Sequence, residues 1–394
     1  MSVRHVTPVF SPLDEALGLV PGSLSPQLLE GVVRLGSSMS FAQASEELAF
    51  CWGVFVSEDT IRRHTEGAGR ALAAVEDATV THLERQWPAP PQGSAVVQWS
   101  MDGAMVPLIH QEWAEVKTAV VGRVEQGRGK DGVAEAHTTD LAYYSRLAEV
   151  GDFAHGQRLL IHRTGLQTAQ TVAAVGDGAL WIQGVIDTYR RDAVRILDFP
   201  HALEHLAAAG SAVFGMDTPA FHAWLARQAH ALKHETPDPV LAALRALPIR
   251  LASDQLRASQ IRDQTIAYLE ARLPQLQYAA FLAQGLPIGS GVVESANKVV
   301  VEARLKGSGM HWERNNVTPM VALRACRCSG RWGQDWPAIL RQLRKQEATR
   351  REALRLQRHP PPKPPDPPNL RLLRSAARKM TARRAHPAPK KRAG

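Results

Sequence analysis

The sequence predicts a mixed α/β protein whose sheet region is preceded and interrupted by helices. Strand-like alternation begins after residue 94 and passes into short apolar strands that alternate with helical segments. A stretch of about 80 residues then has helical patterns alone. These observations divide the chain into an N-terminal helical domain, the first part of a sheet core, a helical insertion, the last part of the core, and a basic Pro-rich tail: 1–88, 89–206, 207–286, 287–340 and 341–394.

The N-terminal domain is expected to contain three helices. Ser25, followed by proline, and Ser40 are typical N-caps, and a third helix is expected after a turn containing Gly53. This pattern fits a plain three-helix bundle and also a helix-turn-helix, in which the second helix of the motif contacts DNA. We favour the helix-turn-helix, with Arg62 and Arg63 facing DNA.

The sheet core begins after a linker, WPAPPQGS, at residues 87–94. In the first strand, period-two alternation puts Val97, Trp99 and Met101 on one face, and Gln98, Ser100 and Asp102 on the other. A second strand is expected at WAEVKTAVVGRV and a weak third near GVAEAHTT, whereas the segment that starts TDLAYYSRL is expected to be helical. Two further strand–helix pairs follow, in TAQTVAAVGDGALWI and DAVRILDFPHALEH. The helical insertion is expected to pack at the sheet edge without filling the core.

Charge is concentrated at the C-terminus. Residues 341–394 contain 17 Lys and Arg against 3 Asp and Glu, a net charge of +14, so the preceding residues carry −5 of the chain's +9. A basic tail on a mildly acidic body indicates a polyanionic partner, and we expect double-stranded DNA. The tail contains PPPKPPDPP and is expected to be disordered.

Composition excludes several classes. No apolar run is long enough for a membrane span, and residues 1–20 lack a secretory signal pattern. Cys51, Cys326 and Cys328 provide no disulfide framework and no CxxC pair. We therefore expect a cytoplasmic, nucleoid-associated protein without membrane contact, in which Cys326 and Cys328 are packing residues.

Three acids stand out by position. Asp102 is on the polar face of the first strand, Asp177 is in a Gly-Asp-Gly turn after a later strand, and Glu294 opens the helix of PIGSGVVESANK. Turn chemistry and surface salt bridges are the ordinary explanations for such residues. Carboxylates at strand ends and on a nearby helix are also the oxygen ligands that two Mg²⁺ ions, about 4 Å apart, require for phosphodiester cleavage.

The segments around these acids, and above all GSGVVES followed by RLKGSGMHW, resemble bacterial insertion-sequence transposases of the DDE class. The likeness is closest to the ISKra-type family and more distant to Mutator-like transposases, and it covers roughly residues 11–336. It implies an RNase H-like core interrupted by a helical insertion. It also implies binding of terminal inverted repeats, metal-dependent DNA cleavage and strand transfer with Mg²⁺ or Mn²⁺, and a homo-oligomer in the DNA complex.

The resemblance assigns Asp102 as the first acid and Glu294 as the last. Two residues match the second. Asp177 has the expected place after a central strand, while Asp198, with His201, matches a D-x-x-H signature. We interpret Asp177 as the metal ligand and Asp198 and His201 as supporting residues. On the last helix and just beyond it, the following basic residues are expected to meet DNA: Lys298, Arg304 and Lys306.

Two other functions compete with this interpretation. HALEH, residues 201–205, spells the H-x-x-E-H pattern of zinc peptidases, with Glu204 as base. The chain is alternatively a catalytically inactive or truncated transposase-derived protein that binds DNA without cutting it. No cysteine occurs in residues 1–10, where ISKra-type proteins usually carry a cysteine-rich segment.

Overall fold

The computed structural model describes residues 24–86, 88–128 and 134–358, and groups the chain into two units, Met1–Arg344 and Lys345–Gly394. The first unit begins with α2 (Pro26–Gly36), α3 (Phe41–Trp52) and α4 (Glu58–Gln86). The predicted caps are confirmed: the Ser25 and Ser40 hydroxyls accept hydrogen bonds from backbone N–H groups three residues ahead, each 3.2 Å long. Gly53 ends α3 with φ of 65°, a conformation that suits glycine. The second helix of the predicted helix-turn-helix is not short, since α4 has 29 residues.

One five-stranded mixed sheet forms the centre of this unit. Its strands are β1 (Val96–Pro107), β2 (Trp113–Arg128), β3 (Ala134–Arg146), β4 (Thr171–Gly176) and β5 (Val194–Leu197). The order is β3-β2-β1-β4-β5; β1 pairs antiparallel with β2 and parallel with β4. β2–β3 is antiparallel and β4–β5 parallel. The helix expected at TDLAYYSRL is wrong, because β3 continues through Arg146. Pairing with the long β2 outweighs the local helical pattern there.

The apolar face of β1 is covered by three helices. These are α5 (Val150–Gly156), α6 (Arg158–Arg163) and α7 (Leu180–Tyr189). Val97, Trp99 and Met101 are buried in one cluster with residues of these helices, as the alternation predicted. The helix predicted between Asp177 and Tyr189 is also confirmed, because α7 occupies this segment.

The predicted insertion is helical, with no strand between residues 207 and 286, all of which are described. Its helices are α8 (Phe199–Phe214), α9 (Pro219–His234), α10 (Asp238–Arg245), α11 (Gln255–Glu270) and α12 (Tyr278–Ala283). The expectation that it fills no part of the sheet core is wrong. Ala173 and Val175 of β4 share one hydrophobic cluster with these helices, and the buried Tyr278 donates to Leu197 O over 2.9 Å. β4 has apolar residues on both faces, so its second face needs this cover.

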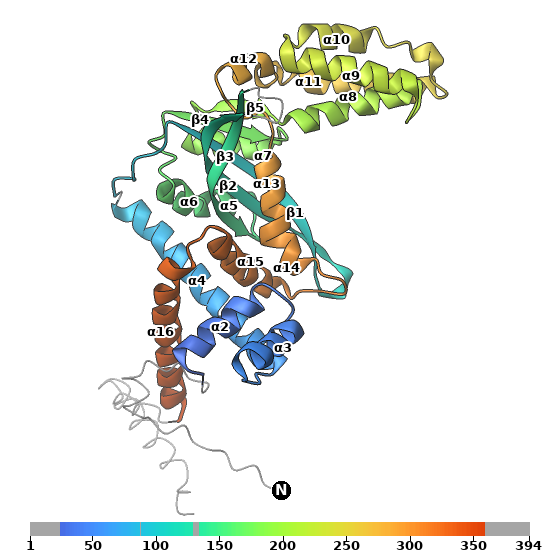
Figure 1. Cartoon of the computed structure of the whole chain (residues 1–394). Coiled ribbons are helices and arrows are strands. Elements are labelled where there is room, and N and C mark those ends of the chain that lie inside the picture. Colours follow the sequence, from blue (N-terminus) through green and yellow to red (C-terminus); the bar gives the residue numbers. More distant parts are fainter. Residues whose placement is uncertain (1–23, 87, 129–133, 359–394) are drawn as a thin grey trace, which may run out of the picture. The chain divides into compact units, whose positions relative to one another are not determined.

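The last part of the core returns to β1 and β2. It contains α13 (Gly291–Ala296), the π-helical segment η4 (Asn297–Glu302), α14 (Ala303–Leu305) and α15 (Arg314–Cys328). Figure 1 shows α13 beside the sheet, and Val293 and Ala296 pack there against Val120. The described residues also include three short 3-10 turns: Ile109–Gln111, Ile249–Leu251 and Leu273–Gln275.

The helix α16 (Trp332–Arg358) crosses the predicted start of the tail at residue 341. Residues 341–358 are therefore helical, which corrects the expectation of disorder for this part. Their sequence contains no proline, and Glu347 pairs with Arg351 four residues later, as in other charged helices. The rest of the predicted tail, 359–394, lies outside the described residues.

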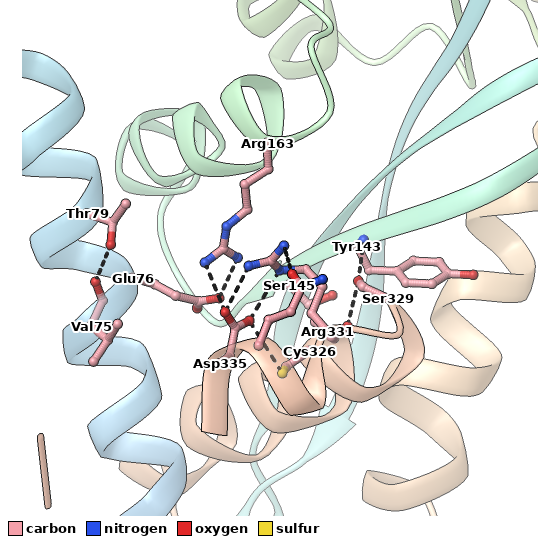
Figure 2. Close-up of polar contacts among 12 residues, drawn as sticks. Val75, Glu76, Thr79, Tyr143, Ser145, Arg163, Cys326, Ser329, Arg331 and Asp335 are labelled. Atoms are coloured by element: carbon pink, nitrogen blue, oxygen red, sulfur yellow. Dashed lines mark hydrogen bonds and ion pairs between the residues drawn. The ribbon is translucent and has the colours of Figure 1, made fainter. Parts of the chain in front are cut away.

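The N-terminal helices are joined to the core by buried charges. Glu76 of α4 pairs with the guanidinium of Arg146 on β3, and both side chains are less than a tenth exposed. Arg163 lies 3.6 Å from Glu76 and 3.7 Å from Asp335 of α16, and Arg331 binds Asp335 at 2.8 Å. Figure 2 shows Glu76, Arg163 and Asp335 converging between α4 and the C-terminal helices. Burial alone would lower the pKa of Arg146, but the neighbouring charge of Glu76 raises it by more. The net shift of this pKa is therefore upward, and the arginine stays charged.

Beside this network, α15 packs against α2 and α4 through an apolar cluster that includes Leu29, Leu72, Leu323 and Trp336. The N-terminal helices and the core therefore share buried surface. No helix among the described residues is both long enough and apolar enough to cross a membrane.

Candidate active site

Asp102 lies on β1, on the sheet face that α13 covers. Its Oδ1 accepts a hydrogen bond from Gly103 N–H (2.7 Å) and its Oδ2 accepts one from Asn297 Nδ2 (2.8 Å). Burial raises the pKa of Asp102, and the nearby charges of Asp177 and Glu115 raise it further against these hydrogen bonds. The carboxylate is thus held in a negative environment, which a cation would relieve.

Asp177 directly follows β4, the parallel neighbour of β1. The register pairs Ser100 with Val175, and two more residues along each strand lead to Asp102 and Asp177. Neighbouring strands are about 4.8 Å apart, so this register brings the two acids together. Asp177 is exposed; its Oδ1 accepts from Ala179 N–H (2.9 Å), while its backbone carbonyl accepts from Tyr268 (2.6 Å). The turn therefore fixes the backbone and leaves the carboxylate open to solvent.

Glu294 is exposed on α13, and Asn297 follows it by three residues. Residues three apart lie on the same helix face, about 5–6 Å apart at Cβ. Because Asn297 contacts Asp102, the face that carries Glu294 is turned toward β1. The structure therefore brings elements bearing all three predicted acids to one region. The described residues nevertheless contain no group of three or more His, Cys, Asp or Glu side chains arranged to hold a metal ion.

Three successive residues of the turn before α13 form hydrogen bonds with β1 or with the start of α8. Ile288 O accepts from Phe199 N–H (2.9 Å), and Gly289 O accepts from Gln98 Nε2 (2.9 Å). Ser290 N–H donates to Asp198 Oδ1 (2.6 Å). Gln98 is itself held by Thr138, whose hydroxyl donates to Gln98 Oε1 (2.5 Å). These bonds set the start of α13, and hence the position of Glu294.

Asp198 is a buried residue whose side chain holds two neighbouring backbone segments in place. It is 4% exposed and caps α8, where its Oδ2 accepts from His201 N–H (3.0 Å) while Oδ1 holds the turn at Ser290. Both carboxylate oxygens are thus engaged by backbone donors, in contrast to the exposed Asp177. This arrangement favours Asp177 as the second acid and Asp198 as a supporting residue, which remains an interpretation.

We expect Asp198→Asn to destabilise the protein more than Asp177→Asn. In the Asp198→Asn variant the amide NH₂ would face one of the two buried N–H donors, leaving that donor unsatisfied at a cost of about 1–3 kcal/mol. The Asp177→Asn variant keeps an oxygen for Ala179 N–H at an exposed position, so its change should stay within about 0.5 kcal/mol. Urea unfolding of both variants measures the difference, and equal stabilities would contradict the structural role of Asp198.

The two histidines of the H-x-x-E-H segment lie close together at the start of α8. The rings of His201 and His205 are 5.0 Å apart, and His205 stacks on Tyr268 at 3.9 Å. His201 lies 3.4 Å from Glu204. In the described part of the chain no further ligand completes a zinc site there.

The residues predicted to contact DNA differ in exposure. Arg62 and Arg63 are exposed on α4 and both bind Asp59, at 2.6 and 2.8 Å. Lys298 is exposed on η4, and Lys306 pairs with Glu302 at 2.7 Å. The prediction that Arg304 contacts DNA is corrected, because its side chain is buried.

Arg304 is 2% exposed, and its guanidinium lies over the rings of Phe41 and Trp312, 4.6 and 4.9 Å from their centroids. Its Nε donates to Gly36 O at the end of α2 (3.0 Å). Burial and the charge of Arg324 lower its pKa to about 10. The sequence pattern placed Arg304 with the exposed Lys298, but Gly36 and Phe41 of the N-terminal region and Trp312 surround its guanidinium.

Asn297 was not among the site residues predicted from the sequence. Its position three residues after Glu294 was a usable signal, because that spacing places an amide and a carboxylate on one helix face. The π-helical segment η4, which begins at Asn297, was not predicted either; such turns are frequent at functional sites.

Comparison with known proteins adds no assignment. No family model matches the chain, and no curated protein is significantly similar to it.

Proposed function

We propose that the chain is a DDE-class transposase, which binds the terminal inverted repeats of an insertion sequence and catalyses DNA strand cleavage and strand transfer. The observation that carries the proposal is the proximity of Asp102 to Asp177 and to the helix of Glu294. It is supported by the strand order and directions, which are those expected of an RNase H-like core.

The residues present fit a divalent cation. Asp102 is a partly buried carboxylate whose raised pKa reflects burial and neighbouring negative charge, and the Oδ1 of the adjacent Asn297 is buried without a hydrogen-bond partner in the described structure. Asp102, Asp177 and Glu294 would hold two Mg²⁺ or Mn²⁺ ions. Bound there, the ions would supply activation of water and stabilisation of the leaving oxygen.

The chain's own residues would then orient the DNA. Asp177 and Glu294 are exposed, whereas Asp102 lies deeper in the site. A phosphodiester would therefore approach from the side of Asp177 and Glu294. Lys298, one turn after Glu294, is an exposed cation that would bind a neighbouring phosphate. Arg62 and Arg63 would contribute to recognition of the DNA ends. Residues 359–394, with their basic charge, would add sequence-independent binding.

The test is incubation of the full chain with duplexes carrying the inverted repeats that flank its coding sequence, with Mg²⁺ or Mn²⁺ and with EDTA as control. Cation-dependent nicks at the repeat ends, and joining of those ends to a second duplex, are expected. Binding of the ends without any nick would overturn the proposal in favour of a DNA-binding protein without catalysis. The observation that favours this second candidate is the lack of a preassembled three-residue metal group among the described residues.

A further inference from the structure

Asn297 is a buried amide with half of its hydrogen bonding unmet. The residue is 6% exposed, and its Nδ2 donates to Asp102 Oδ2 over 2.8 Å. Its Oδ1 is buried and has no hydrogen-bond partner in the described structure. A buried acceptor left in this state is unfavourable, whereas an apolar side chain of similar size would avoid that cost.

The surroundings indicate what kind of partner Oδ1 would take. The same amide touches Asp102, whose neighbours Asp177 and Glu115 both add negative charge. A negative environment favours a cation over another acceptor-bearing group. An amide oxygen is also a hard ligand of the kind that Mg²⁺ and Mn²⁺ bind together with carboxylates.

The helix geometry places this oxygen with the predicted acids. Asn297 begins η4 one turn after Glu294, so one helix presents a carboxylate and an amide toward β1. We propose that Asn297, through Oδ1, is a further ligand of the divalent cation bound at Asp102. This inference rests on the proposed function, because it concerns the same cation site.

Titration of the full chain with Mn²⁺, in the absence of DNA and followed by electron paramagnetic resonance, tests the inference. Asn297→Leu removes the oxygen and keeps the approximate volume, so Mn²⁺ affinity should fall at least tenfold, as expected when a group that supports a metal site is lost. Asn315→Leu, at an exposed position of α15, is the matched control and should bind Mn²⁺ as the natural chain does.

A second variant separates ligation from positioning. Asn297→Asp keeps an oxygen but loses the N–H that holds Asp102. Mn²⁺ affinity should be retained or increased if the oxygen is a ligand. If the amide acts only as a donor to Asp102, this variant should bind Mn²⁺ as weakly as Asn297→Leu, which would overturn the inference.

The outcomes also distinguish this inference from the proposed function. Mn²⁺ binding that depends on Asp102 but is unchanged in Asn297→Leu overturns the inference and leaves the transposase proposal intact. Mn²⁺ binding that depends on both residues, in a protein that never nicks DNA, supports the inference and overturns the proposed function. Binding that is unaffected by Asp102→Asn overturns the cation site itself, and the inference with it.

Discussion

Asp102→Asn is expected to abolish cation-dependent DNA cleavage, lowering its rate by several orders of magnitude. The substitution keeps the shape of the side chain and removes the charged ligand that the cation needs. Binding of the DNA ends should remain, since the residues proposed for recognition lie on α4 and in the tail. Cleavage assays and DNA binding measured on the same preparation test both statements.

The same variant should be more stable than the natural chain when no cation is present. The pKa of Asp102 is raised in the folded protein, chiefly by burial, so the folded state holds this proton more tightly than the unfolded state does. Ionisation of Asp102 therefore costs folding stability as pH rises through its ordinary value toward the raised one, and the full cost persists at neutral pH. The neutral amide of the Asp102→Asn variant avoids this cost, and the difference should vanish below the ordinary pKa of an aspartate. Unlike Asp198, which is held by two backbone donors, Asp102 is held by one backbone donor and by the side chain of Asn297, whose amide can rotate to accept from the new NH₂ group.

Thermal unfolding in EDTA at pH 7 and at low pH, with and without Mg²⁺, measures these changes. The natural chain should gain stability with Mg²⁺, while Asp102→Asn should gain little. Asp140→Asn is the matched control, since Asp140 is exposed and pairs with Arg123 away from the site. A variant at Asp102 that cleaves like the natural chain, or that is destabilised at pH 7 in EDTA, would contradict this account.

Glu76→Gln should cause the largest loss of stability, about 3–5 kcal/mol. The substitution leaves Arg146 buried without the carboxylate that balances its charge, and removing one partner of a buried ion pair has a cost of this size. Arg163, also near Glu76, loses part of its compensation too. Urea unfolding of the full chain measures the change.

The matched control is Glu84→Gln on the same helix. Glu84 pairs with Arg158, but both side chains are about a third exposed, so solvent screens the pair and its loss should cost less than about 1 kcal/mol. Equal losses for the two substitutions would show that burial of the Glu76 network does not determine its contribution.

Local signals were sufficient for much of the fold. The caps at Ser25 and Ser40 and the alternation along β1 each depend on a few neighbouring residues, and all are confirmed. The face of β1 that carries Asp102 was predictable for the same reason. In contrast, β3 depends on pairing with β2, a tertiary effect that overrides the helical pattern of TDLAYYSRL.

The sequence predicted which acids belong to the candidate site, but it did not predict the contacts that surround them. Asp177 follows the end of β4, as its Gly-Asp-Gly turn indicated. Asp102 lies on the predicted face of β1 but within the strand and not at its end, because β1 stays paired with β2 as far as Pro107. The contact of Asn297 with Asp102 and the burial of Arg304 depend on residues distant along the chain, such as Gly36 and Phe41. No short-range pattern contains that information.

The burial of Arg304 beneath the N-terminal helices limits how modular this protein is. The carbonyl of Gly36 and the ring of Phe41 contact the guanidinium of Arg304 on α14. Leu29 and Leu72 cover apolar residues of α15. A chain cut at residue 88 would expose that arginine and those apolar residues together. Replacing the N-terminal helices by those of another protein would therefore require matching changes on α14 and α15.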